Sequence, residues 1–163
     1  MEESQNSEKS ETETNINFNR ISAIDCCFNI RRSSRIITQI YDFAFRKIGI
    51  TSSQFFLLAA LANNDMDTLT SMADDLGMDR STLSRNLPPL KHRHYIENSF
   101  VKDKRKIAYQ LTESGHSILR NAYIIWKPLN DKIIAIITLE RYGNFLDELT
   151  HLTNILPDQF DTF

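Results

Sequence analysis

The residues with the clearest chemical potential lie between Asp79 and Lys106, where positive charge is concentrated. This segment has eight lysines and arginines against three acidic residues, a net charge of +5, whereas the whole 163-residue chain has a net charge of −2. The basic residues are Arg80, Arg85, Lys91, Arg93, Lys102, Lys104, Arg105 and Lys106. Charge gathered in one segment of a near-neutral protein is typical of a surface that contacts the phosphate backbone of a nucleic acid. An ordinary solvated face mixes both signs. We therefore expect this segment to bind nucleic acid.

The elements that must position these charges form a helix-turn-helix pattern. Thr68 is predicted to cap a short helix ending at Leu76, and Gly77 provides a tight turn. Asp79 is predicted to cap a second helix that begins at Arg80. Two short helices at this spacing are the arrangement by which many proteins place one helix in a DNA groove.

The second helix is predicted to have one apolar face and one polar face. Helical spacing places three leucines on one side: Leu83, Leu87 and Leu90. The opposite side holds Ser81, Ser84, Arg85 and Pro88, with Arg80 at the edge. Hydroxyl and guanidinium groups in the first two turns are the groups that read base edges in the major groove. The alternative is that these are ordinary surface residues with no role in binding. Pro88 and Pro89 predict a kink in the second half of the helix, because each removes a backbone N–H.

A β-hairpin is predicted to follow this helix. Tyr95–Glu97 and Ile107–Leu111 read as two short strands around a charged turn. A hairpin whose tip holds Asp103, Lys104 and Arg105 would form a wing that reaches a neighbouring minor groove, where cations are favoured.

The remaining chain predicts long helices with apolar stripes. Thr51 and Gln54 form a capping-box pattern before a short buried helix, and Thr112 is predicted to cap a long one. The helices at about 21–47 and 113–156 have more apolar surface than one small module can bury, which predicts dimerisation.

The expected fold class is therefore mainly α with a small β-hairpin wing: a winged helix-turn-helix flanked by N- and C-terminal dimerisation helices. Residues 1–20 are predicted to form a disordered acidic and polar tail, and residues 21–160 one domain. Within that domain the helix-turn-helix spans about 68–94 and the wing about 95–111.

The sequence argues against an enzyme, a cofactor and a metal. Its four glycines never cluster into a phosphate-binding loop, and its four histidines form no helical pair suited to a metal. Cys26 and Cys27 are adjacent and cannot readily form a disulfide with each other, which suggests free thiols. There is no run of apolar residues long enough for a signal peptide or a membrane span, so we expect a cytoplasmic protein.

The residues resemble the MarR family of bacterial transcription regulators over about residues 26–156. The similarity is strongest in F-N-I-R-R-S-S-R-I-I-T-Q-I-Y-D, in G-I-T-S-S-Q-F-F-L-L-A-A-L and in L-G-M-D-R-S-T-L-S-R-N-L. The wing pattern D-K-R-x5-L-T-E-S-G matches a D-x-R-x5-L-T-x-x-G signature.

This resemblance implies a homodimer of winged helix-turn-helix subunits that binds a pseudo-palindromic operator in double-stranded DNA. Such regulators usually repress transcription until a ligand or an oxidant releases them. Carried over by position, Ser81, Thr82 and Arg85 would face bases, Arg105 would enter the minor groove, and Asp103 would hold Arg105 in place.

Three questions of function stay open at the level of sequence. A small aromatic ligand could release the DNA, although no residue identifies it. Cys27 and Tyr41 resemble the peroxide-sensing branch of the family, but Arg31 and Ser52 stand where that branch has its other two tyrosines. Arg31 could still stabilise a Cys27 thiolate, whereas the competing interpretation is that Cys27 only packs as a small buried hydrophobe. Finally, a winged-helix protein could use the same surface as an adaptor for protein contacts.

Overall fold

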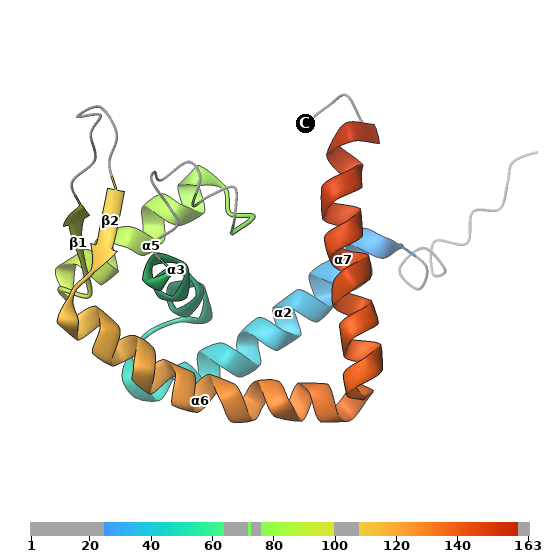
Figure 1. Ribbon diagram of the computed structural model, residues 1–163, viewed down its shortest axis with the longest axis horizontal. Coiled ribbons are helices and arrows are strands. Elements are labelled where there is room, and N and C mark those ends of the chain that lie inside the picture. Colours follow the sequence, from blue (N-terminus) through green and yellow to red (C-terminus); the bar gives the residue numbers. More distant parts are fainter. Residues whose placement is uncertain (1–24, 64–71, 73–75, 100–107, 160–163) are drawn as a thin grey trace, which may run out of the picture. The chain divides into compact units, whose positions relative to one another are not determined.

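The computed structural model describes residues 25–63, 72, 76–99 and 108–159 (Figure 1). Two compact units divide between Gln39 and Ile40, and the second holds the elements predicted to read DNA. The predicted fold class is confirmed: helices dominate and one antiparallel β-hairpin is present. Within the described ranges, no helix combines the length and hydrophobicity needed to cross a membrane.

Helix α2 spans Cys26–Phe45 and continues as a 3-10 turn at Arg46–Ile48. The Asp25 carboxylate accepts a hydrogen bond from the Phe28 N–H at 2.6 Å and so satisfies one free donor of the first turn. Gly49 ends the turn with a φ of 72°, a left-handed conformation that glycine adopts at little cost. The helical segment ends at Ile48, close to the predicted end near residue 47, while the expected start near residue 21 lies outside the described residues.

Helix α3 spans Ser52–Ala62 and begins with the predicted capping box. The Thr51 hydroxyl accepts from the Gln54 N–H at 3.2 Å, and the Gln54 side chain accepts from the Thr51 N–H at 3.1 Å. A second cap comes from α2, because Asp42 accepts the Ser52 N–H at 2.6 Å. Local sequence and tertiary packing therefore both fix the start of this helix.

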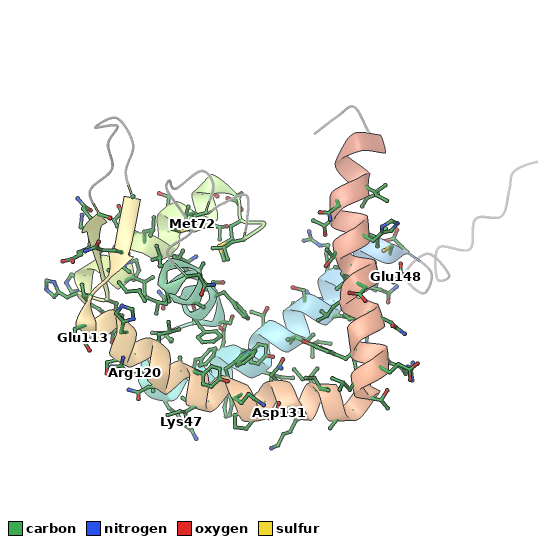
Figure 2. All side chains as sticks on the ribbon, viewed as in Figure 1. Lys47, Met72, Glu113, Arg120, Asp131 and Glu148 are labelled. Carbon is green, nitrogen blue, oxygen red and sulfur yellow. The ribbon has the colours of Figure 1, made fainter. Side chains whose placement is uncertain are left out.

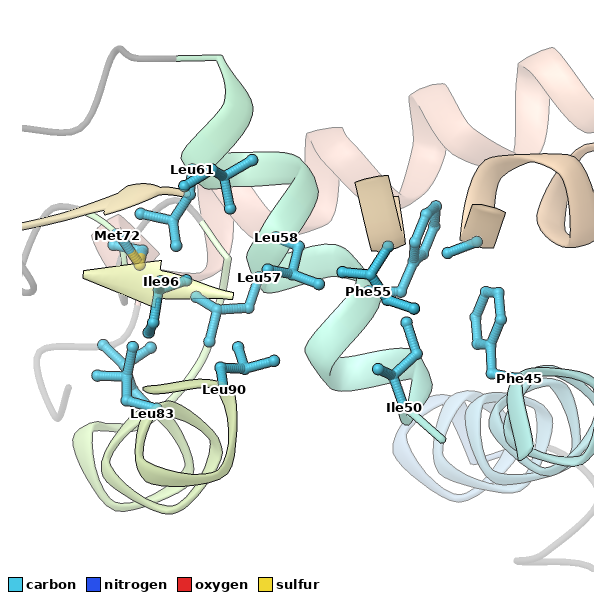
Figure 3. Packing of buried hydrophobic residues seen from close by; sticks show 14 of the residues in the cluster. Phe45, Ile50, Phe55, Leu57, Leu58, Leu61, Met72, Leu83, Leu90 and Ile96 are labelled. Carbon is cyan, nitrogen blue, oxygen red and sulfur yellow. The ribbon is translucent and has the colours of Figure 1, made fainter. Parts of the chain in front are cut away.

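Helix α5 spans Arg80–His92 and is capped by Asp79, as the sequence predicts. Its leucine face is buried: Leu83, Leu87 and Leu90 are at most 7% exposed. Figure 3 shows Leu83 and Leu90 directed toward side chains that include Leu57 of α3 and Ile96 of β1. Burying each leucine stabilises the fold by about 2 kcal/mol. The helix continues as one element through Pro88 and Pro89.

Strands β1 (Ile96–Ser99) and β2 (Ala108–Leu111) pair antiparallel, with Ile96 opposite Leu111 and Ser99 opposite Ala108. Ile96 and Leu111, the two residues of the first pair, are both buried, so the base of the hairpin lies in the core. The first strand begins one residue later than predicted, because the Tyr95 N–H donates instead to the Leu90 carbonyl near the end of α5, at 3.0 Å.

Helices α6 (Glu113–Ile137) and α7 (Leu139–Gln159) complete the chain. Thr112 caps α6 as predicted, its hydroxyl accepting the Gly115 N–H at 3.0 Å. Ile118 and Ala122 bury one face of α6 against the core. Large apolar side chains remain exposed toward the end of α6 and along α7: Ile136, Leu139, Phe145, Leu146, Ile155 and Leu156.

Candidate nucleic-acid interface

The polar face of α5 is exposed on the side opposite its buried leucines. Ser81, Ser84 and Arg85 are exposed and Thr82 is half-buried, while Arg80 is the first residue of the helix. Because the buried leucines fix the rotation of α5 on the core, these polar side chains point outward whether or not they make contacts themselves. The helix thus presents two hydroxyls and one guanidinium to solvent within its first two turns.

A hydrogen-bond network joins the cap of α5 to this polar face. Asp79 accepts the Thr82 N–H at 2.8 Å, the Thr82 hydroxyl at 2.8 Å and the Ser81 hydroxyl. Arg85 Nη2 donates to Thr82 Oγ1 at 3.1 Å. Hydrogen bonds from the Ser81 hydroxyl and from the Thr82 hydroxyl and N–H hold the pKa of Asp79 well below its usual range, so the carboxylate is ionised at neutral pH. Sequence reasoning identified the cap but missed the network, although hydroxyl residues two and three positions after a capping aspartate are a usable signal.

The wing is held at its base by contacts from α5. Lys91 Nζ donates to Asn98 Oδ1 at 3.2 Å and lies 5.9 Å from the centre of the Tyr109 ring. Gln110 donates to Glu97 across the two strands at 2.8 Å. The tip residues predicted to reach DNA, Asp103, Lys104 and Arg105, lie outside the described residues.

The end of α5 is also tied to the turn between α2 and α3. The Arg93 guanidinium donates to the Gly49 carbonyl, and His94 follows with a φ of 56°. The His94 carbonyl accepts from the hydroxyls of Thr112, at 2.6 Å, and Ser114. These bonds join segments that are distant in the sequence, so no local sequence pattern could predict them.

A pocket of about 530 Å³ lies between α3 and α6. Its wall is mostly apolar, with polar groups at Asn63, His116 and Arg120. The apolar lining residues are Phe55, Ala59, Ala62, Leu119, Tyr123 and Ile124. Arg120 makes one loose ion pair with Glu113, at 3.5 Å between two exposed side chains, which leaves its charge available (Figure 2). An apolar cavity of this size with one cation suits a small aromatic anion.

Both cysteines are free and exposed in the single chain, which corrects the interpretation of Cys27 as a buried packing residue. Tyr41 is buried, and that burial, together with the nearby Tyr142, raises the pKa of its phenol. Cys27 and Tyr41 lie on the same helix, and fourteen helical residues span about 21 Å. The Tyr41 hydroxyl of the same helix therefore cannot reach the Cys27 thiol.

Comparison with known proteins finds transcriptional regulators. The chain is 24% identical to the HTH-type transcriptional regulator SarZ of Staphylococcus haemolyticus over 138 residues, covering 83% of this chain and 89% of that protein. It is 30% identical to the organic hydroperoxide resistance transcriptional regulator of Bacillus subtilis over 90 residues, 55% of this chain and 61% of that one. No family model matches the chain.

Solved structures agree with these relatives. The M. tuberculosis transcriptional regulator MosR, crystallised with DNA, superposes with a TM-score of 0.72 at 26% identity, over 82% of this chain and 96% of that one. A mutant of E. coli MarR, complexed with operator DNA, gives a TM-score of 0.72 at 18% identity, over 82% and 96%. The second likeness concerns the fold, while the first joins fold and sequence. With the capped helix α5, the paired hairpin and the long flanking helices, these likenesses show that the chain resembles the MarR-family winged helix-turn-helix transcription regulators in fold and in sequence.

Proposed function

We propose that the protein is a homodimeric transcriptional repressor that binds a pseudo-palindromic operator in double-stranded DNA. The supporting observation is the exposed face of α5, where Ser81, Ser84 and Arg85 lie opposite the buried leucines. Arg85 can donate two hydrogen bonds to one guanine, and the serine hydroxyls can bond bases or phosphates. Arg80 and Lys104 supply further positive charge, and Arg105, oriented by Asp103, enters the minor groove beside the wing.

Dimerisation supplies the second half of this site. The apolar side chains left exposed on α7 need a partner surface, and a second copy of the chain offers the same surface. A two-fold dimer presents two α5 helices to successive major grooves about one DNA turn apart, which matches a palindromic operator.

The first experiment measures the affinity of the purified protein for operator fragments selected from its own genome. Arg85→Ala is expected to weaken specific binding by about 1 to 3 kcal/mol and to remove the preference at one base pair of each half-site. Arg141→Ala, which removes an exposed arginine from α7, is the matched control and should leave the preference intact. An equal loss on specific and random DNA would make Arg85 a phosphate contact.

Salt dependence separates a repressor from a winged-helix adaptor. Binding to DNA releases counterions, so the affinity of the wild type is expected to fall steeply as salt rises. A partner protein bound mainly through apolar contacts would show little such dependence. Failure to bind DNA at any salt concentration would favour the adaptor.

We propose that a small aromatic anion in the pocket between α3 and α6 releases the DNA. Its ring would contact Phe55 and Tyr123, and its charge would pair with Arg120. The chain's single tryptophan reports on this pocket, because the ring centre of Trp126 lies 6.0 Å from that of Phe55 and 5.7 Å from that of Tyr123.

Titration with salicylate is expected to change Trp126 fluorescence and to release operator DNA, and Arg120→Ala should weaken both effects by at least about fivefold. Arg120→Lys, which keeps the charge but not the planar fork, should fall between. Binding that is unaffected by Arg120→Ala would exclude the pocket as the anion site.

Release by oxidation of Cys27 is the competing mechanism, and the exposure of this thiol favours it. If it operates, organic hydroperoxide will release DNA from the wild type and from Cys26→Ser but not from Cys27→Ser. Release that is identical in all three proteins would remove the thiol from the mechanism.

A further inference from the structure

The hydroxyl groups at the start of α5 are held in one hydrogen-bond polarity. A serine or threonine hydroxyl has one proton to donate and two lone pairs that accept. Ser81 gives its proton to the Asp79 carboxylate, and Thr82 gives its proton to the other oxygen of the same carboxylate. Thr82 also accepts from Arg85. Ser81 is therefore left with lone pairs only toward solvent.

The carboxylate makes this polarity stable. A hydrogen bond from a hydroxyl to an ionised carboxylate is roughly twice as strong as one between neutral groups. The depressed pKa of Asp79 keeps it ionised near neutral pH, so protonation does not reverse the arrangement. A DNA phosphate accepts hydrogen bonds, so Ser81 could donate to a phosphate only by breaking its bond to Asp79. The phosphate is also negative and would be repelled by the Asp79 carboxylate.

We propose that Asp79 is a positioning residue that sets base specificity: it makes Ser81 an acceptor that selects a base with an exposed amino group. This inference rests on the proposed function of α5 as the helix that reads DNA. In the major groove only adenine N6 and cytosine N4 donate hydrogen bonds, so Ser81 favours those two bases. Thr82, half-buried and engaged by Asp79 and Arg85, then orients the reading groups and contacts no base itself.

The geometry of α5 also predicts how far apart in the operator the bases read by Ser81 and Arg85 lie. Ser81 and Arg85 are four residues apart and both exposed, so they are neighbours on one face, separated by about 6 Å along the helix axis. Base pairs rise by about 3.4 Å each. The acceptor Ser81 and the donor Arg85 therefore read positions within about two base-pair steps, which places adenine or cytosine close to the guanine that Arg85 favours.

The test is Asp79→Asn, read by selecting bound duplexes from a random pool. Asparagine is as good a helix cap as aspartate, so the bond from the Thr82 N–H and the thermal midpoint should be retained. The oxygen that keeps the Thr82 N–H is the one that accepts from the Ser81 hydroxyl, and in asparagine it is neutral and holds the Ser81 proton about half as strongly, while the amide nitrogen replaces the oxygen that accepts from the Thr82 hydroxyl. At one base pair of each half-site, a preference of about tenfold for the amino-bearing base is therefore expected to fall to about threefold or less. Binding to random DNA should tighten, because a negative charge has been removed from the interface.

Two companion variants make the outcome decisive. Ser81→Ala should flatten the same base pair, whereas Ser117→Ala removes an exposed hydroxyl from α6, outside the reading face, and should leave that base pair unchanged. If Asp79→Asn keeps the wild-type profile at every position, Asp79 is only a cap and the inference is overturned. If the wild type selects a clear operator but Ser81→Ala does not alter it, the inference fails while the proposed function stands. If the wild type selects no sequence, both fail.

Discussion

Gly115→Ala is expected to lower the free energy of unfolding by about 3 kcal/mol. A Cβ at this position would overlap the Tyr95 carbonyl oxygen far inside van der Waals contact and would lie 3.3 Å from Leu111 Cδ2. The carbonyl is not free to move, because it accepts the Thr112 N–H at 3.1 Å where β2 joins α6. The added methyl group must therefore push α6 away from the hairpin. Urea unfolding at fixed protein concentration, followed by circular dichroism, measures the loss.

Gly143→Ala is the matched control for this substitution. Gly143 lies inside α7, and an added Cβ would meet no heavy atom within 4 Å. Alanine is the better helix former, so this variant is expected to gain about 0.5 to 1 kcal/mol. Two glycine-to-alanine changes in helices should thus have opposite signs. Equal effects would mean that the close approach of Gly115 to Tyr95 does not exist in solution.

Phe145→Lys is expected to convert the dimer to monomers and to weaken operator binding by more than about 100-fold. Phe145 is 48% exposed on α7, so the change should cost the single chain little, but a charge buried at the interface between two copies would be expensive. Each half-site alone binds weakly, because the second subunit adds its contacts at a high effective concentration. Sedimentation and operator titration measure the two effects together.

Asn144→Lys provides the control for charge. It adds the same positive charge at the neighbouring exposed position of α7, and it should leave the dimer intact. If both variants remain dimers that bind as the wild type does, the exposed face of α7 at Phe145 is not the interface, and the dimer must use another surface. A Phe145→Lys protein that unfolds instead would show that this side chain packs within its own chain.

Local sequence determined the helices and the orientation of α5. Thr51, Asp79 and Thr112 cap the helices that follow them, because a side-chain oxygen at this position accepts a hydrogen bond from a free backbone N–H three residues later. The rotation of α5 followed from the spacing of its leucines, since a 3.6-residue period fixes which side chains point away from the core. The exposed Ser81 and Arg85 could therefore be named from sequence, and the wing signature from its resemblance to a family.

The contacts between segments far apart in the sequence are set only by the tertiary structure. The glycine of the wing signature could be recognised, but its cause, the Tyr95 carbonyl twenty residues earlier, could not. The bond from Arg93 to the Gly49 carbonyl and the pocket beside Arg120 likewise join residues far apart in the chain. The exposure of Cys27 also escaped prediction, because the average tendency of cysteine to be buried says nothing about one helix face. Periodicity and capping act over one or two helical turns, whereas close contacts and cavities depend on how whole elements pack.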